Sequence, residues 1–141
     1  MHLKKIAIIV SHGTFNNLIQ VSTLLRALTA GLDVSIRVFF RDEALYKLTK
    51  GRINEPNFSE LFRSQQKEFM EKLKAAEFVD LESFLKDSKE HGFDVKFFAC
   101  ASTMYIYGIK EEELSPILDE PRTLTTFLLE DVGEADTLMT F

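Results

Sequence analysis

The first forty residues constrain the fold most strongly, because two apolar runs flank one helical pattern. Residues 4–10 form a short, β-branched run, which is typical of a strand buried on both faces of a parallel sheet. Apolar residues then recur at helical spacing over residues 14–30, and Gly31 is a typical helix stop. A second apolar run spans residues 34–40. This β-loop-α-β order predicts a right-handed crossover and a parallel strand pair.

The rest of the chain continues the alternation after a more polar stretch. We expect a helical insertion at about 41–92, which is too long for a simple crossover connection. A third strand is predicted at 93–99, a short helix at 102–107 and a final strand at 135–141. The pattern therefore predicts an α/β fold with three α/β/α layers around a mainly parallel sheet of about five strands. We expect one domain over residues 1–141, which is long enough to bury a single core.

Composition and charge exclude several classes of protein. Hydrophobic residues make up 45% of the chain and charged residues 28%, the usual balance of a globular domain. The formal net charge is -5. An acidic surface repels phosphate backbones, so we expect no nucleic-acid partner. No segment approaches the ~20 apolar residues of a membrane span, and the apolar run after Lys5 is too short for a signal peptide.

The supply of cysteine and histidine limits the chemistry further. A single cysteine cannot form an internal disulfide, which favours a reducing, cytoplasmic setting. One cysteine and three histidines without ligand spacing predict no metal site. The chain has neither of the common glycine-rich nucleotide motifs, so we expect no cofactor.

Two short loops are the candidates for a functional site, because ligands of open parallel sheets bind beyond the carboxyl ends of the strands. The first loop follows the first strand, and the second follows the third strand. If these two strands are neighbours in the sheet, His12 and Cys100 approach each other. The residues of the first loop are Ser11, His12, Gly13 and Thr14, and those of the second are Ala99, Cys100, Ala101, Ser102 and Thr103.

Cys100 is the most informative of these residues. It stands at a strand-to-helix junction, where free N–H groups and the helix dipole favour an anion such as a thiolate. A thiolate can attack a disulfide, a persulfide or another electrophile. The small neighbours Ala99 and Ala101 leave the sulfur open, and Ser102 and Thr103 can donate hydrogen bonds to it. The other interpretation is a packing residue, because free cysteines are often buried.

The first loop offers two further roles. His12 can act as a proton donor or as a cation beside the thiolate, or it can be a loop histidine that only bonds the backbone. Ser11, Gly13 and Thr14 can bind a phosphate or another oxyanion at the start of the first helix. The sequence establishes no catalytic base.

Several segments together resemble a known family. The sequence is similar to the DsrE/DsrF-like family of small sulfur-transfer proteins, in particular the DsrE2-type branch. The segments that carry the resemblance are Lys5–Thr14, Val95–Met104, Gly108–Leu114, Thr126–Leu128 and Glu134–Phe141. The resemblance implies a parallel-sheet fold and a homo-oligomer, often a trimer or larger. It also implies that Cys100 carries sulfur as a persulfide or related adduct between donor and acceptor proteins or small sulfur compounds, with His12 nearby.

The chain also departs from these relatives. The segment 51–57 is short and polar where DsrE2-type proteins often hold an apolar Gly/Pro/Met-rich stretch, and no second cysteine can resolve an adduct. Tyr105, Ile106 and Tyr107 make the helix after Cys100 unusually aromatic, which suggests that they close over the sulfur or fill a subunit interface.

Our first hypothesis from the sequence is a cytoplasmic sulfur carrier or sulfurtransferase. One alternative is a non-catalytic module that binds a small anion or nucleotide at residues 11–14, with Cys100 only packing. A further alternative is a thiol redox sensor, in which Cys100 forms a sulfenic acid or mixed disulfide.

Overall fold

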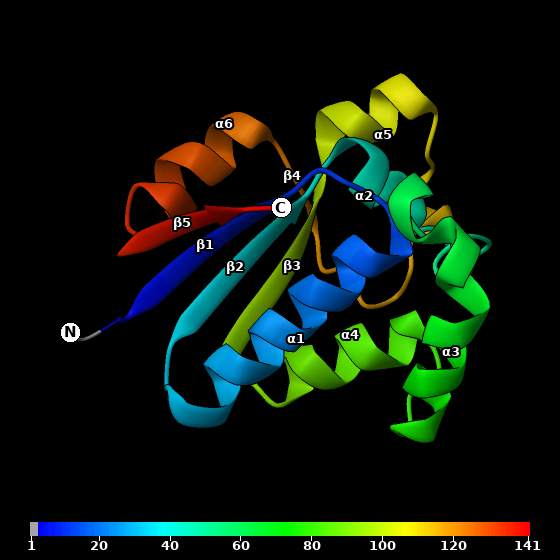
Figure 1. Ribbon diagram of the computed structural model, residues 1–141. Helices are drawn as coiled ribbons and strands as arrows, with labels where there is room; N and C mark the ends of the chain where they lie inside the picture. The colour runs from blue at the N-terminus through cyan, green and yellow to red at the C-terminus, as the bar shows by residue number, and fades with distance from the viewer. Residues whose placement is uncertain (1–2) are drawn as a thin grey trace.

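The computed structural model describes residues 3–141 and contains a five-stranded, all-parallel sheet with helices on both faces (Figure 1). The strand order is β4-β3-β2-β1-β5, which confirms the predicted α/β fold. The strands are β1 (Lys5–Val10), β2 (Ser35–Phe40), β3 (Asp94–Cys100), β4 (Pro121–Arg122) and β5 (Thr137–Thr140).

Helices from different parts of the chain cover the two faces of the sheet (Figure 1). Helices α1 (Phe15–Gly31) and α4 (Leu81–Glu90) lie side by side on one face, where the hydroxyls of Ser22 and Ser88 are 2.7 Å apart. On the other face, α6 (Leu124–Thr126) continues directly into the π-helical turn η3 (Phe127–Val132).

The predicted helical insertion has two parts. α4 is the crossover helix that returns the chain to β3, so it belongs to the regular layer. The additional segment before it contains α2 (Asp42–Lys47), the 3-10 helix η1 (Glu60–Gln65) and α3 (Gln66–Ala75). Aromatic rings attach this segment to α1: the Phe58 ring centroid lies 5.2 Å from that of Phe15 and 5.8 Å from that of Phe69. These phenylalanines therefore pack the extra segment onto the core.

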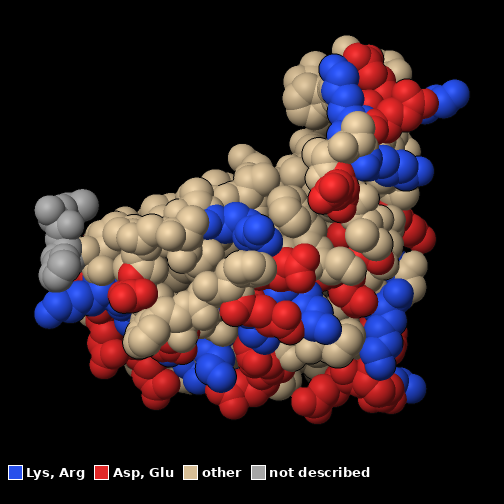
Figure 2. Space-filling view, turned by 90° about the horizontal axis from the view of Figure 1, so that it is seen from below, with Lys and Arg blue, Asp and Glu red and all other residues tan. Residues whose placement is uncertain are grey.

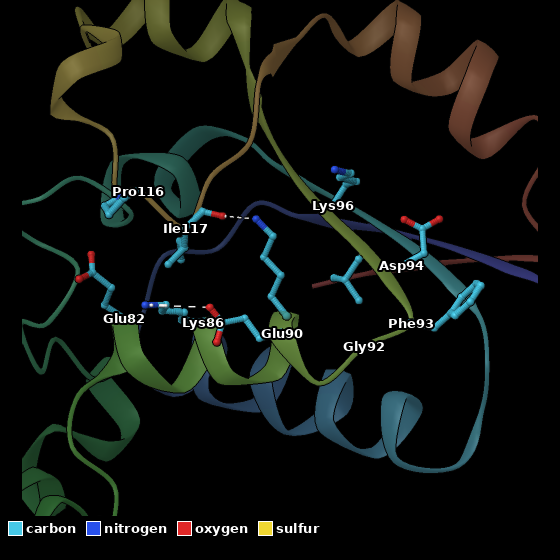
Figure 3. A pocket seen from close by; sticks show the side chains of 11 residues that line it. Glu82, Lys86, Glu90, Gly92, Phe93, Asp94, Lys96, Pro116 and Ile117 are labelled. Carbon is cyan, nitrogen blue, oxygen red and sulfur yellow. Dashed lines mark hydrogen bonds and ion pairs between the residues drawn. The ribbon is translucent and has the colours of Figure 1, made fainter.

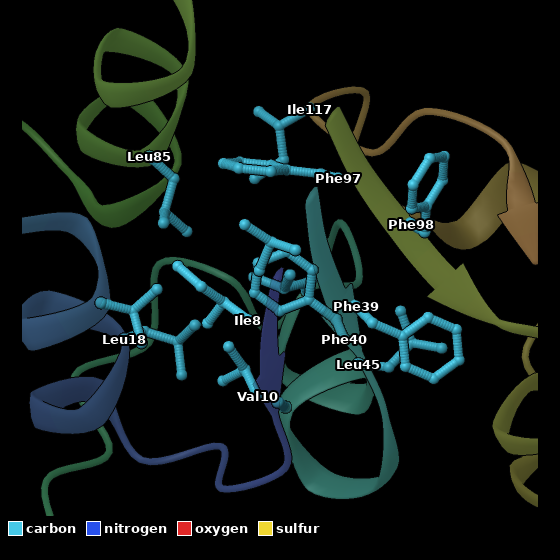
Figure 4. Close-up of a cluster of buried hydrophobic side chains, with 14 of the residues drawn as sticks. Ile8, Val10, Leu18, Phe39, Phe40, Leu45, Leu85, Phe97, Phe98 and Ile117 are labelled. Carbon is cyan, nitrogen blue, oxygen red and sulfur yellow. The ribbon is translucent and has the colours of Figure 1, made fainter. Parts of the chain in front are cut away.

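Strand alternation divides the buried side chains between the two faces of the sheet (Figure 4). Phe40 and Phe97 meet edge to face on the α1/α4 side, with ring centroids 5.3 Å apart. Phe39 and Phe98 point to the opposite side, where both contact Phe127 of η3. Phe127 thus closes the core on the second face.

The second face also carries a buried ionic cluster. The carboxylate of Asp131, whose side chain is only 5% exposed, lies 2.7 Å from Arg122 Nη1, 3.4 Å from Lys5 Nζ and 4.0 Å from Arg37 Nε. Three cations share one buried acid, so the charge is compensated by β1, β2 and β4 together. This cluster fixes η3 against three strands.

The surface seen from below carries acidic and basic side chains close to one another, without a continuous basic area (Figure 2). No helix within residues 3–141 is both long and apolar enough to cross a membrane. The absence of a nucleic-acid partner stays a prediction from composition.

The stacking of Phe127 on Phe39, with ring centroids 4.8 Å apart, predicts a large cost of truncation. Phe127→Ala should lower the free energy of unfolding by about 3–5 kcal/mol, because it leaves a cavity between the sheet and η3. The matched control is Leu129→Ala in the same turn, which is 73% exposed and should change stability by less than about 0.5 kcal/mol. Urea unfolding followed by circular dichroism measures both. Equal effects of the two variants would contradict the packing described here.

Candidate functional site

Three strand ends meet at the carboxyl edge of the sheet. Val10 of β1 is in register with Phe40 of β2, and Phe40 is in register with Ala99 of β3. β2 therefore lies between β1 and β3, so the condition under which His12 and Cys100 would approach each other is not met. The two predicted loops do share one edge, but a strand end separates them.

Cys100 is the last residue of β3 and immediately precedes α5 (Ala101–Tyr107), as predicted from the sequence. Its side chain is buried, with 2% of the residue exposed, so the expectation of an open sulfur is wrong. Ala101 is half-buried and Ser102 is exposed. The small neighbours Ala99 and Ala101 therefore do not uncover the sulfur.

Thr103 makes a different contact from the one predicted. Its Oγ1 accepts a hydrogen bond of 3.0 Å from the backbone N–H of Asp42, and the residue is buried. Asp42 adopts a left-handed backbone with φ of 48°, which is uncommon for a residue other than glycine. The bond to Thr103 thus holds a strained turn between β2 and α2 against the helix that follows Cys100.

Arg41, at the end of β2, is a residue of this edge that the sequence analysis missed. It follows Phe40 directly, as Cys100 follows Ala99, so the two residues stand at matching positions on neighbouring strands. Arg41 Nε is buried and has no hydrogen-bond partner among residues 3–141; the nearest carboxylate oxygen, Asp42 Oδ2, is 3.5 Å away. Ligands of open parallel sheets bind beyond the carboxyl ends of the strands, and this rule applies to β2 as well as to β1 and β3. It could therefore have identified Arg41.

Several polar groups of the Ser11–Thr14 loop form hydrogen bonds within the protein. The N–H groups of Ser11 and His12 both donate to the carbonyl of Phe141, and Thr14 Oγ1 caps α1 by accepting from the N–H of Asn17. The His12 side chain is exposed, and its carbonyl accepts from the Asn17 amide. The N–H groups of Gly13 and Thr14 are not among these bonds, so this loop has fewer backbone donors for an anion than its four residues suggest.

Gly13 allows this loop to approach the start of α2. A Cβ atom at Gly13 would overlap the backbone carbonyl of Glu43. The N–H of Ala44 also donates to the carbonyl of Ser11 at 3.1 Å. The loop after β1 and the first turn of α2 are therefore in direct backbone contact.

A hollow of about 280 Å³ opens beside this contact, and its most unusual lining residue is Lys47 of α2. Only 4% of Lys47 is exposed, and its Nζ donates to the carbonyl oxygens of Arg52 and Glu55. Burial lowers the pKa of the Lys47 ammonium to about 8, although the charge of the Glu55 carboxylate acts in the opposite direction. Nothing in the sequence around Lys47 indicates that this lysine is buried, so the sequence analysis did not identify it.

A second hollow, of about 540 Å³, lies between α4 and the first half of β3 (Figure 3). Two of its lysines are paired inside the protein: Lys89 Nζ is 2.9 Å from Asp119 Oδ2 and donates to the carbonyl of Ile117, and Lys86 faces Glu90 at 4.0 Å. Lys96 also lines the hollow. Cys100 and His12 do not line it, so the hollow is separate from the two predicted loops.

Metal ligands are not grouped in the part of the chain that the structure describes. No three side chains of His, Cys, Asp or Glu within residues 3–141 stand close enough to hold a metal ion.

The sequence was compared with known families, curated proteins and solved structures. A profile of the DsrE/DsrF-like family matches residues 4–141. The chain belongs to the DsrE/DsrF-like family. No curated protein matches its sequence significantly.

Solved structures agree with this assignment at the level of the fold. The DsrE-like chain is similar to the ychN protein from E. coli, with a TM-score of 0.62 and 19% identity over 99% of this chain and 100% of that one. It is also similar to MTH1491, a protein of unknown function from Methanobacterium thermoautotrophicum, with a TM-score of 0.65 and 14% identity over 96% and 98% of the two chains. At these identities the likeness extends to the fold alone.

The lowered pKa of Lys47 predicts a stability that rises at alkaline pH. The unfolded lysine has a pKa near 10.5 and the folded one a pKa of about 8, so below pH 8 both states are protonated and the burial cost is fully present. Between about pH 8 and pH 10.5 the folded state loses its proton first, and the free energy of unfolding should rise by up to about 3 kcal/mol.

The measurement is urea unfolding across this pH range, with Lys47→Met as the reference. The quantity of interest is the difference between the two proteins, because it isolates the contribution of Lys47. Lys50→Met changes an exposed lysine three residues away and should keep the wild-type slope. Parallel pH profiles of the wild type and Lys47→Met would contradict the burial of a charged Lys47.

Proposed function

We propose that this DsrE-like protein is a cytoplasmic sulfur carrier or sulfurtransferase that holds sulfur on Cys100 as a persulfide or related adduct. The observation that carries the proposal is the place of the chain's one cysteine, between the end of β3 and the first turn of α5. Membership of a family generally linked to sulfur transfer supports it. Ligands of parallel α/β sheets bind at this edge.

The burial of Cys100 favours a small donor. A cysteine persulfide on a partner protein cannot reach a side chain that is 2% exposed without displacement of α5, whereas thiosulfate or a short polysulfide needs only a narrow opening. The Cys100 thiolate attacks the sulfane sulfur of thiosulfate, a new S–S bond forms, the S–S bond of thiosulfate breaks, and sulfite leaves with the electron pair. An acceptor thiolate then takes the outer sulfur from Cys100 by the same displacement.

Charged groups at the edge have distinct places in this proposal. Arg41 stands at the matching position of the neighbouring strand, and in this proposal its guanidinium supplies a positive charge near Cys100. Such a charge stabilises a thiolate or persulfide anion. His12 keeps only an auxiliary role, because β2 lies between its loop and Cys100 and its ring is exposed to solvent.

The test is intact mass after exposure to thiosulfate or polysulfide, with Cys100→Ser as the reference. We expect the mass of added sulfur on the wild type alone, and its removal by a thiol reductant. Arg41→Gln should slow the uptake, whereas Arg63→Gln, which changes an exposed arginine of η1, should leave the rate unchanged.

Two outcomes overturn the proposal. If Cys100 is alkylated in the native protein yet takes up no sulfur, the sulfur chemistry is wrong. If Cys100 resists both reagents until the protein is unfolded, it is a packing residue, and its burial then favours the alternative of a small-anion-binding or regulatory module. Faster reaction with peroxide than with either sulfur donor would favour the redox-sensor alternative.

We also propose that the protein forms a homo-oligomer through α5. Tyr105 and Ile106 are 89% and 72% exposed, and the ring of Tyr107 pairs with that of Tyr46 at 6.1 Å. Neighbouring exposed apolar side chains are typical of protein interfaces. Burial of α5 by a second copy would place the interface beside Cys100.

Ile106→Glu should therefore shift the protein towards the monomer, because it introduces a charge into the apolar contact. Leu61→Glu is the matched control, since Leu61 of η1 is exposed to a similar degree, 79% against 72% for Ile106. Light scattering coupled to size exclusion measures the mass of each. A monomeric wild type, or an Ile106→Glu variant of unchanged mass, would contradict the interface.

A further inference from the structure

The hollow of about 280 Å³ beside the Ser11–Thr14 loop contains the buried ammonium of Lys47, and Glu55, the carboxylate whose charge acts on it, is exposed and forms no ion pair with it. Buried lysines are ordinarily paired with a carboxylate, because an isolated charge is costly to remove from water. Within residues 3–141 the acceptors of Lys47 Nζ are two backbone carbonyl oxygens, those of Arg52 and Glu55, and no carboxylate forms an ion pair with it. An ammonium has three N–H groups, so these two carbonyls leave one of them unused. Nζ also lies over the Phe15 ring, 5.6 Å from its centroid, which is a weaker contact than a hydrogen bond to an anion.

A second cation lines the same hollow in a fixed orientation. The guanidinium of Arg52 lies over the ring of Tyr46, 4.0 Å from its centroid, and Nη1 donates to Thr49 Oγ1 at 3.0 Å. A guanidinium has five N–H groups, so most of them stay available to a ligand. Stacking on an aromatic face positions an arginine for anion recognition.

The other lining groups define the size and the charge of a ligand. Thr14 supplies a hydroxyl, and Gly13 keeps the wall between the loop and α2 free of a side chain. Glu43 and Glu55 also line the hollow, but both are exposed, so water screens their charges more than it screens that of Lys47. The buried part of the hollow is therefore positive, and the hollow is large enough only for a small molecule.

We propose that Lys47 and Arg52 form a binding site for a small oxyanion with two negative charges, of the sulfate, thiosulfate or phosphate type. The anion accepts a hydrogen bond from the remaining N–H group of the Lys47 ammonium. The Arg52 guanidinium binds it from the open side of the hollow, and the Thr14 hydroxyl contacts it. The site does not include Cys100 and does not depend on the sulfur-carrier function. It differs from an anion site built on the backbone of residues 11–14, because its ligating groups are the side chains of Lys47, Arg52 and Thr14.

The occupied site also explains why α2 tolerates a buried lysine. Without an anion, Lys47 only attaches the 52–55 segment to α2 through two carbonyl groups and bears a desolvation cost. With an anion, the ammonium gains a charge-assisted hydrogen bond in a place where water screens it weakly. Occupancy should therefore raise the pKa of Lys47 from about 8 towards its ordinary value.

Isothermal titration calorimetry with sulfate, thiosulfate and phosphate at constant ionic strength, balanced with chloride, tests the site. We expect saturable binding of one anion per chain. Arg52→Gln should weaken it by about tenfold or more, because it removes the outer cation and leaves the backbone carbonyl that Lys47 uses. Lys50→Gln and Arg63→Gln are the charge-matched controls on exposed positions, and both should bind as the wild type does.

Proton uptake on anion binding distinguishes a ligand-binding role of Lys47 from a purely structural role. Near pH 8 about half of the Lys47 side chains are neutral, so anion binding should take up a fraction of a proton, measured from enthalpies in two buffers of different ionisation heat. Lys47→Met should abolish both the uptake and the binding. Arg52→Gln keeps the site testable if Lys47→Met does not fold.

Failure of this site is distinguishable from failure of the sulfur chemistry. Cys100→Ser should bind sulfate and phosphate as the wild type does, since neither anion carries a transferable sulfur. No saturable binding, or binding that is equally strong in Arg52→Gln, would overturn the site. Binding without proton uptake near pH 8 would also overturn it, because the anion would then not contact Lys47.

Discussion

The parallel pairing of all five strands is the constraint on which the rest of this structure depends. Parallel strands about 4.8 Å apart bring every carboxyl end to one edge, so the loops after β1, β2 and β3 must share that edge. The register of Val10, Phe40 and Ala99 aligns these ends residue by residue. Cys100, Arg41 and the first loop meet for this reason, although long segments of chain separate them in the sequence.

The packing behind the edge explains why its groups are held so firmly. Phe127 closes the second face over Phe39 and Phe98, and Asp131 compensates three cations from three strands. The extra segment between α2 and α4 is attached to α1 by aromatic contacts. Lys47 is buried where α2 lies against the 52–55 segment, whose carbonyl groups accept hydrogen bonds from its Nζ. The burial of Lys47 is therefore a consequence of the fold, because the fold places α2 between the first loop and the 49–57 segment.

Much of the architecture could be predicted because its signals are local. The β-branched run of β1 and the helical spacing of α1 each depend on side chains a few residues apart, and parallel pairing follows from their order. The place of Cys100 at the end of β3 came from the same reasoning. The strand order did not, because β-loop-α-β-type connections are compatible with more than one neighbour for β1. The expected approach of His12 to Cys100 depended on that order, and the insertion of β2 between them removed it.

The sequence by itself determined the α/β class, the parallel strands, the family segments and the position of the one cysteine at a strand-to-helix junction. Only the tertiary structure decided that Cys100 is buried, that Arg41 stands beside it on the next strand, and that the buried Lys47 lines a hollow in which its Nζ bonds two backbone carbonyl groups. The physical reason is the range of the forces involved. Secondary structure follows from neighbours along the chain, whereas exposure and charge compensation follow from groups that the fold brings together from distant segments.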